Sequence, residues 1–246
     1  MNTLTLAYPD STVHEATAAA IIRVLEANDV EPEIVTGPKD ALAGLLRKNE
    51  IDLYVAAWLP GDSDLLTTGA TPLGDLFQPG ACCCISAEDT PLSSLADIVR
   101  AGPELSRIIV TPQSLETVMQ TVLATYGLAA AGFTLKVLPD EEALAELNAA
   151  LTRKDPVLMP LMQPCFLFHQ GGFRILSDPQ GAFGPEQHAR MLLRAGLEAE
   201  LEQDLLDELD ELMLSVKIIS AMDYAMRVDG MTADEAAEAC RAARLP

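Results

Sequence analysis

The side chains best suited to chemistry are few and scattered along this sequence. Cys165 follows Pro164 and lies four residues before His169, which makes it a candidate nucleophile with a nearby base. A spacing of four on an irregular segment does not fix that geometry, and the other two histidines are distant, at His14 and His188. No hydrolase, P-loop or dinucleotide motif is present. The sequence therefore favours a protein that is not an enzyme, and we expect no catalytic residue.

The five cysteines do not suggest a disulfide framework or a metal site. Cys82, Cys83 and Cys84 are consecutive, and neighbours on a strand point to opposite faces. No C-x-x-C spacing occurs, and no cluster of ligand residues has the spacing that zinc needs. We expect small buried thiols here, with no metal and no cofactor.

The net charge narrows the range of partners. Lys and Arg number 16 against 37 Asp and Glu in 246 residues, a formal net charge of −21. Binding to nucleic acid or to an anionic membrane surface requires clustered basic residues, so we expect neither. No apolar run approaches the 20 or so residues of a membrane span, so we expect no direct insertion into a membrane. No signal peptide is recognisable, which indicates a cytoplasmic protein if Met1 is the native start.

The pattern along the chain predicts strands that alternate with helices. Strands are expected at 4–8, 33–36, 51–57, 81–86, 107–110, 134–138, 157–161 and 173–176, and helices at 12–27, 41–47, 92–100, 112–126 and 139–152. The segment 69–80 has the composition of a loop, and everything after 185 is expected to be helical. One of these helices, at 197–212, carries a leucine stripe among many acids.

The two alternating series, at 3–57 and 107–161, predict two α/β lobes with mostly parallel sheets and helices on both faces. In such sheets ligands bind beyond the carboxyl ends of the strands, near helix N-termini. The segments in that position are 8–12, 58–63, 111–114 and 162–166. Two lobes favour a protein that closes on a ligand held in the cleft between them.

Several segments, in order, resemble the substrate-binding proteins of glycine betaine, choline and proline betaine ABC transporters. The strand 52–60 is similar to the family's strand that ends in Ala-Trp-Leu-Pro, and Leu6–Ser11 is similar to its first strand and helix start. Further similarity is found at 95–98, 164–168, 173–179 and 228–237. The resemblance covers nearly the whole chain. It implies a two-lobe fold of the type II periplasmic binding proteins with a helical C-terminal tail. The expected lobes are 1–84 with 165–246, and 85–164.

The resemblance also implies a ligand and a site. A quaternary ammonium group cannot donate a hydrogen bond, so aromatic faces bind it by cation–π attraction and dispersion. The small-molecule ligand would be delivered to an ABC transporter permease, outside the cytoplasm. The ligand-binding residues implied are Trp58, Tyr8, Pro9, Asp10, Ser11, Thr111, Ser114, Met162, Cys165 and Phe166.

This chain departs from the family pattern at the site itself. Trp58 is its only tryptophan, where the family has three in its cage; Pro9 and Met162 stand at the other two positions. Cys165 and Ser63 replace two histidines of the family. A cage of Trp58, Tyr8 and Phe166 remains conceivable, with Met162 as a soft wall.

Two alternatives stay open. One is a changed or lost ligand, with the protein acting as a cytosolic sensor or interaction module on the same fold. The other is a purely structural role for individual site residues. Trp58 and Met162 can be packing residues, Tyr8 an ordinary residue at a strand end, and Asp10 and Ser11 simple helix caps.

Overall fold

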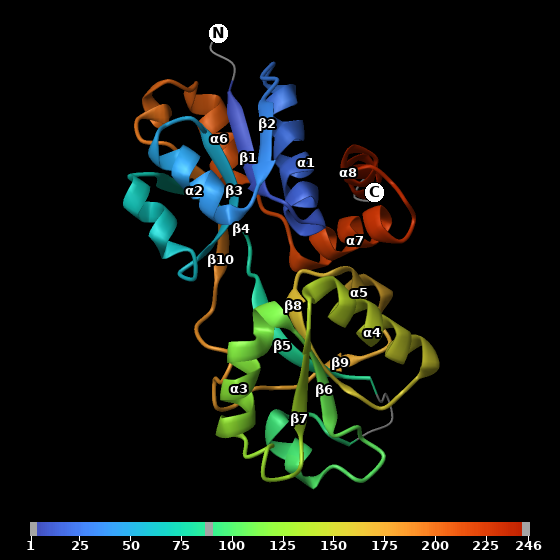
Figure 1. Cartoon of the computed structure of the whole chain (residues 1–246). Coiled ribbons are helices and arrows are strands. Elements are labelled where there is room, and N and C mark those ends of the chain that lie inside the picture. The colour runs from blue at the N-terminus through green and yellow to red at the C-terminus, as the bar shows by residue number, and fades with distance from the viewer. Residues whose placement is uncertain (1–3, 87–90, 243–246) are drawn as a thin grey trace. The chain divides into compact units, whose positions relative to one another are not determined.

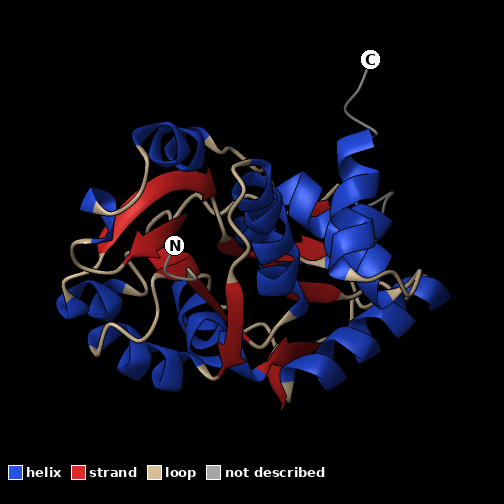
Figure 2. Cartoon of the chain, turned by 90° about the horizontal axis from the view of Figure 1, so that it is seen from above, coloured by secondary structure: helices blue, strands red, loops and turns tan. Residues whose placement is uncertain are grey.

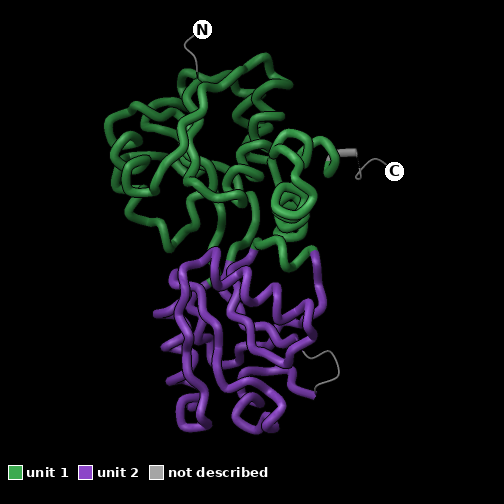
Figure 3. Tube along the Cα trace, turned by 45° about the vertical axis from the view of Figure 1, so that its right-hand side comes forward, with its two compact units in different colours: residues 1–79, 164–169, 186–246 green, residues 80–163, 170–185 purple. Residues whose placement is uncertain are grey.

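The computed structural model describes residues 4–86 and 91–242. The chain forms two compact units (Figure 3) and consists of both helices and strands (Figure 2). Unit 1 comprises residues 1–79, 164–169 and 186–246, and unit 2 comprises 80–163 and 170–185. The lobe boundaries expected from the sequence stay a prediction, and residue 3, the expected start of the first series, lies outside the described residues.

Unit 1 is built on a five-stranded sheet with the order β2-β1-β3-β10-β4. The strands are β1 (Thr5–Pro9), β2 (Glu33–Gly37), β3 (Leu53–Leu59), β4 (Thr71–Phe77) and β10 (His188–Leu193). β1 pairs in parallel with β2 and β3, whereas β10 is antiparallel to both β3 and β4. The sheet is therefore mixed: β10 runs opposite to the other four strands, and the mostly parallel sheet expected for this half of the chain is wrong for the pairings that β10 makes.

Helices cover both faces of this sheet (Figure 1). On one face, Leu6, Leu53 and Met191 pack with α1 (Thr12–Ala27), α6 (Gln203–Glu211), α7 (Val216–Arg227) and α8 (Ala233–Ala242). On the other face, Ala7 and Tyr54 pack with α2 (Lys39–Arg47) and the short helix η1 (Ser63–Thr68). Ser11 is the N-cap of α1, and its side chain accepts the His14 N–H, which confirms the role of helix cap considered for Ser11.

A β-bulge interrupts β3 just before its tryptophan. Between the pairs Ala57–Arg190 and Tyr54–Leu192 the register shifts, so Val55 and Ala56 together oppose one residue of β10. Ala56 has φ of +56°, the left-handed conformation found at one kind of bulge. Val55 and Ala56 both belong to the core on the α1 face. The bulge thus shifts the alternation of side chains by one residue and places Trp58 on the α1 face instead of the α2 face.

Unit 2 contains a three-stranded antiparallel sheet, β8-β5-β9, and a parallel pair, β6-β7. The strands are β5 (Gly80–Ile85), β6 (Ile108–Pro112), β7 (Thr134–Leu138), β8 (Leu158–Gln163) and β9 (Arg174–Ile175). The helices are η2 (Leu95–Arg100), η3 (Gln113–Leu115), α3 (Glu116–Thr125) and α4 (Asp140–Arg153). The helix expected from 112 therefore begins as η3 and continues as α3.

The cysteine triplet lies on β5, as the sequence predicts. Cys83 is fully buried in the core of unit 2, and this burial raises the pKa of its thiol. Cys82 and Cys84 lie on the other side of the strand, with their Sγ atoms 3.8 Å apart. In the described part of the chain these cysteines form no disulfide.

Three expectations about secondary structure are wrong. The segment 69–80 contains β4, and the region after 185, expected to be helical, contains β10, so His188 lies on a strand. The predicted helix at 197–212 is split into η4 (Leu197–Ala199) and α6. The leucines Leu197, Leu205 and Leu209 nevertheless join the core on the α1 face. Within residues 4–86 and 91–242, none of the helices combines the length and apolar character needed to cross a membrane.

Candidate ligand-binding site

The backbone around Trp58 is held by the turn that follows it. The Trp58 N–H donates to the Asp62 carboxylate at 2.9 Å, and the Asp62 N–H donates back to the Trp58 carbonyl at 2.8 Å. Lys39, from α2, forms an ion pair with the same carboxylate. Trp58 is partly buried, and its indole Nε1 is buried without a hydrogen-bond partner among the described residues. The single tryptophan therefore has a fixed main chain and a polar edge left unsatisfied.

One face of the Trp58 indole is covered by His14. The two rings stack with centroids 5.7 Å apart and an angle of 15° between their planes. His14 comes from the first turn of α1, and its Nδ1 lies 2.7 Å from the Ser11 hydroxyl. A hydrogen bond also joins its ring to the Ala56 carbonyl at the bulge. The bulge thus both turns Trp58 toward α1 and anchors the ring that covers it.

Tyr8 and Pro9 end β1 at the same edge of the sheet as the start of α1. Tyr8 is partly buried and packs against the core on the α1 face. Burial raises the pKa of its phenol, and the negative charges of Glu15 and Asp10 raise it further. Asp10 is exposed, and its N–H donates to the Gly37 carbonyl at 3.3 Å. The carboxylates give this edge a negative potential, which favours cations.

Cys165 and Phe166 stand at the start of the short helix α5 (Phe166–Gln170), and α7 holds both by their backbone. The Cys165 N–H donates to the Ser220 hydroxyl at 3.2 Å, and the Phe166 N–H donates to the Asp223 carboxylate at 2.7 Å. Asp223 also accepts from the Thr12 hydroxyl at 2.5 Å and from Arg227 Nε at 2.8 Å. This buried carboxylate ties α1, α5 and α7 together.

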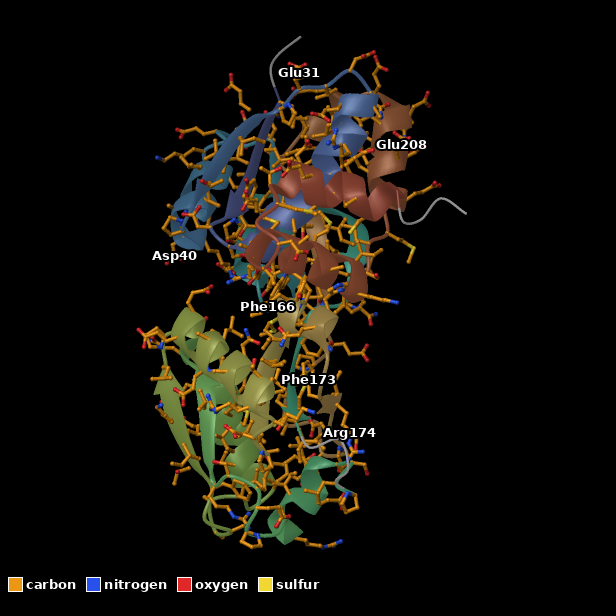
Figure 4. All side chains as sticks on the ribbon, turned by 90° about the vertical axis from the view of Figure 1, so that its right-hand side faces the viewer. Glu31, Asp40, Phe166, Phe173, Arg174 and Glu208 are labelled. Atoms are coloured by element: carbon orange, nitrogen blue, oxygen red, sulfur yellow. The ribbon has the colours of Figure 1, made fainter. Side chains whose placement is uncertain are left out.

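The ring of Phe166 already faces a cation within the protein. The Arg227 guanidinium carbon lies 5.6 Å from the ring centroid. Phe166 itself is 7% exposed (labelled in Figure 4). The adjacent pair of His169 and Tyr224 has ring centroids 4.9 Å apart. The aromatic residues of this segment are therefore engaged mainly with α7.

The three remaining residues of the expected site belong to unit 2. Thr111 is fully buried at the end of β6, and its hydroxyl donates to the Ile109 carbonyl at 3.0 Å. Ser114 is exposed in η3, with its N–H donated to Asp140 at 2.9 Å. Met162 is partly buried on β8 and packs against the core of unit 2.

A groove of about 740 Å³ in unit 1 contains none of the predicted residues. It lies between the start of β1 and the segment 197–205, and Glu31 on its lining is labelled in Figure 4. Arg194 lies within it, joined by ion pairs to Asp52 and Glu200. These hydrogen bonds and ion pairs raise the pKa of Arg194 above its ordinary value. Arg194, Asp52 and Glu200 thus satisfy one another.

The sequence reasoning missed several residues of this region. His14 was given no part in the site, although one turn of helix separates it from the Ser11 cap. Asp62 follows Trp58 by four residues within a turn, a position where a carboxylate often accepts backbone N–H groups. Asp223 and Arg227 are four apart on a helix, and a lone acid on the apolar face with Ile219 and Met222 was a usable signal of a buried network.

Comparison with known proteins agrees with this fold. A lactococcal OpuAC in a closed form with glycine betaine superposes with a TM-score of 0.75 at 16% identity, over 98% of this chain and 95% of that one. A glycine betaine/L-proline-binding protein from Borrelia burgdorferi gives 0.71 at 20% identity, over 98% and 93%. A choline-binding protein in complex with choline gives 0.68 at 18% identity, over 96% and 87%. A comparison with curated protein sequences finds no significant match.

These likenesses define the class: the chain has the α/β fold of the type II periplasmic binding proteins. Residues 2–242 match the family described as the substrate-binding domain of ABC-type glycine betaine transport systems. The chain belongs to this OpuAC family, whose members bind solutes for transporters.

Proposed function

We propose that this protein binds a quaternary amine of the glycine betaine or choline type and delivers it to an ABC transporter, outside the cytoplasm. The observation that carries the proposal is the placement of Trp58. A bulge turns the chain's only tryptophan onto the α1 face, and Asp62 fixes its backbone. An aromatic face held in this way is what a cation without hydrogen-bond donors requires.

The electrostatics of the same edge support a cationic ligand. Asp10, Glu15 and Asp62 lie around Tyr8 and Trp58, and the first two raise the pKa of the Tyr8 phenol. A negative potential that disfavours the phenolate favours an ammonium group for the same reason. The contributions of Thr111, Ser114 and Met162 from unit 2 stay a prediction, as do those of Cys165 and Phe166.

The proposal is tested by thermal unfolding and by Trp58 fluorescence with choline, glycine betaine, carnitine and proline betaine. A ligand at 100 times its dissociation constant adds about 2.7 kcal/mol of stability. For a chain of this size that corresponds to a rise in Tm of roughly 5–11 °C. The control compound is 3,3-dimethylbutan-1-ol, which has the shape of choline without its charge. It is expected to give no rise in Tm.

The matched variants are Trp58→Leu and Tyr54→Phe. Tyr54 lies on the same strand but packs on the opposite face, with α2. We expect Trp58→Leu to abolish the ligand-induced rise in Tm and Tyr54→Phe to retain it. A wild-type protein that responds to none of the amines contradicts the proposal and favours a changed ligand.

A further inference from the structure

His14 is placed to decide how Trp58 meets a ligand. Its ring is nearly parallel to the indole at 5.7 Å, so one of the two indole faces is covered from within unit 1. Three contacts hold the imidazole there: the stack itself, the Ser11 hydroxyl on Nδ1 and the Ala56 carbonyl. The Ala56 carbonyl belongs to the left-handed residue of the bulge.

The partners of the imidazole suit its neutral form. One ring nitrogen donates to the Ala56 carbonyl and the other accepts from the Ser11 hydroxyl, so a single proton satisfies both sides. Burial lowers the pKa of His14 to about 4, against the opposing effect of the Asp62 carboxylate and the Ala56 carbonyl, while Lys39 lowers it further. At neutral pH the ring is therefore uncharged.

The other charged groups of this region come from α1, α2, the turn after Trp58 and α7. Glu15 lies beside His14 on α1, and Lys39 on α2 is neutralised by Asp62 in the turn after Trp58. On α7, which packs against α1, the Asp223 carboxylate accepts hydrogen bonds from the Thr12 hydroxyl and from Arg227 Nε. Lys39 and Arg227 are each paired with a carboxylate, so protonation of His14 would place a new positive charge directly against the indole.

We propose that His14 is a positioning residue of the ligand site, whose neutral ring supports one face of Trp58 so that the other face receives the ammonium group, and whose protonation expels that group. The inference rests on the proposed function. On this view the imidazole of His14, from α1, contributes a ring to a cage that has one tryptophan where the family has three. An imidazolium on the indole would itself take up the cation–π attraction and would repel a second cation.

The effect of pH on affinity follows from the fraction of protein with a neutral ring. If only that form binds, the apparent dissociation constant rises about twofold at pH 4 and about tenfold at pH 3. Choline is the probe, because it has no group that titrates in this range. Trp58 is the only tryptophan, so its fluorescence reports the stack directly, and an imidazolium in contact with indole quenches it.

The experiment measures choline affinity and Trp58 fluorescence from pH 7 to pH 3 in the wild type, His14→Gln and His14→Phe. We expect wild-type affinity and fluorescence to fall with one midpoint near pH 4. His14→Phe, which keeps a ring that does not titrate, is expected to bind choline at pH 7 and to show a smaller fall of both signals at low pH than the wild type does. His14→Gln, which lacks the ring, is expected to bind more weakly at every pH.

Three outcomes overturn the inference. If choline binds at pH 7 but its affinity in the wild type does not change down to pH 3, His14 has no influence on the cation. If affinity falls in the same way in His14→Phe, another group is responsible. If choline and the other amines fail to bind at any pH, the proposed function itself is wrong. The first two outcomes differ from this one, because in both of them choline binds at pH 7.

Discussion

Replacement of Asp223 by asparagine tests the buried network that joins α1, α5 and α7. The Asp223 side chain is 2% exposed and accepts from the Phe166 N–H, the Thr12 hydroxyl and Arg227 Nε. Asparagine has nearly the same volume, so the change creates no cavity. The NH₂ group of asparagine, however, would face either the Phe166 N–H or the donors of Thr12 and Arg227, so that two donors would oppose each other. The negative charge is lost as well.

The expected cost can be estimated from the separate contacts. Loss of a charged acceptor for the buried Phe166 N–H costs about 1.5–3 kcal/mol. Arg227, with a side chain 23% exposed, loses one carboxylate partner but keeps some solvation. Removing one member of a buried ion pair costs about 3–5 kcal/mol in all. For a chain of this length the expected fall in Tm is roughly 6–20 °C.

Urea and thermal unfolding followed by Trp58 fluorescence measure this cost in unit 1, to which both Trp58 and the network belong. Asp229→Asn is the matched control, since Asp229 is an exposed acid just beyond the same helix. Its effect is expected to lie within about 0.5 kcal/mol of zero. If Asp223→Asn changes stability no more than Asp229→Asn does, the carboxylate does not hold these helices together and the reasoning is refuted.

Two further predictions concern unit 2. Lys154 is exposed at the C-cap of α4 with φ of +59°, so Lys154→Gly is expected to stabilise by about 0.5–1 kcal/mol in urea unfolding; a loss of stability would contradict the role of backbone strain. The pKa of Asp178 is lowered: burial raises it, but hydrogen bonds from the Tyr126 hydroxyl and from the N–H groups of Phe183, Ala182 and Gly181 outweigh that effect. Its contribution to stability is therefore present above pH about 4 and is lost as the pH falls through the lower folded value. Tyr126→Phe is expected to cost about 1.5–3 kcal/mol at pH 7 and less at pH 2, and an equal cost at both would contradict the assignment.

The sequence predicts the parallel part of the fold well. β1, β2 and β3 with α1 and α2 were expected from alternating apolar runs and helix signals, and the structure confirms them. β10 was missed because it is the fourth of five strands in the sheet, so that Met191, Leu192 and Leu193 are all buried and no alternation is visible. β4 was missed because Thr, Pro and Gly between 71 and 74 are typical of a loop.

The candidate site was predictable in part, for a similar reason. The ends of β1 and β3 are set by local signals, and these placed Tyr8, Ser11 and Trp58 at one edge of the sheet. Which face Trp58 occupies depends on the bulge at Ala56, which requires the pairing with β10. A period of two residues assigns Trp58 to the face of Tyr54, whereas the bulge moves it to the face of His14. No local pattern in the sequence reveals that shift.

The position of β10 has a consequence for how the protein is made. During synthesis from the N-terminus, β3 and β4 emerge more than 100 residues before His188–Leu193, the strand that lies between them. Until then both strands expose unpaired edges, which are sites of aggregation in incompletely folded chains. Unit 2, complete by residue 185, has all its strands available earlier. A nascent chain of which residues 1–185 have left the ribosome is therefore expected to carry a folded unit 2, while the sheet of unit 1 is still open and exposed to aggregation.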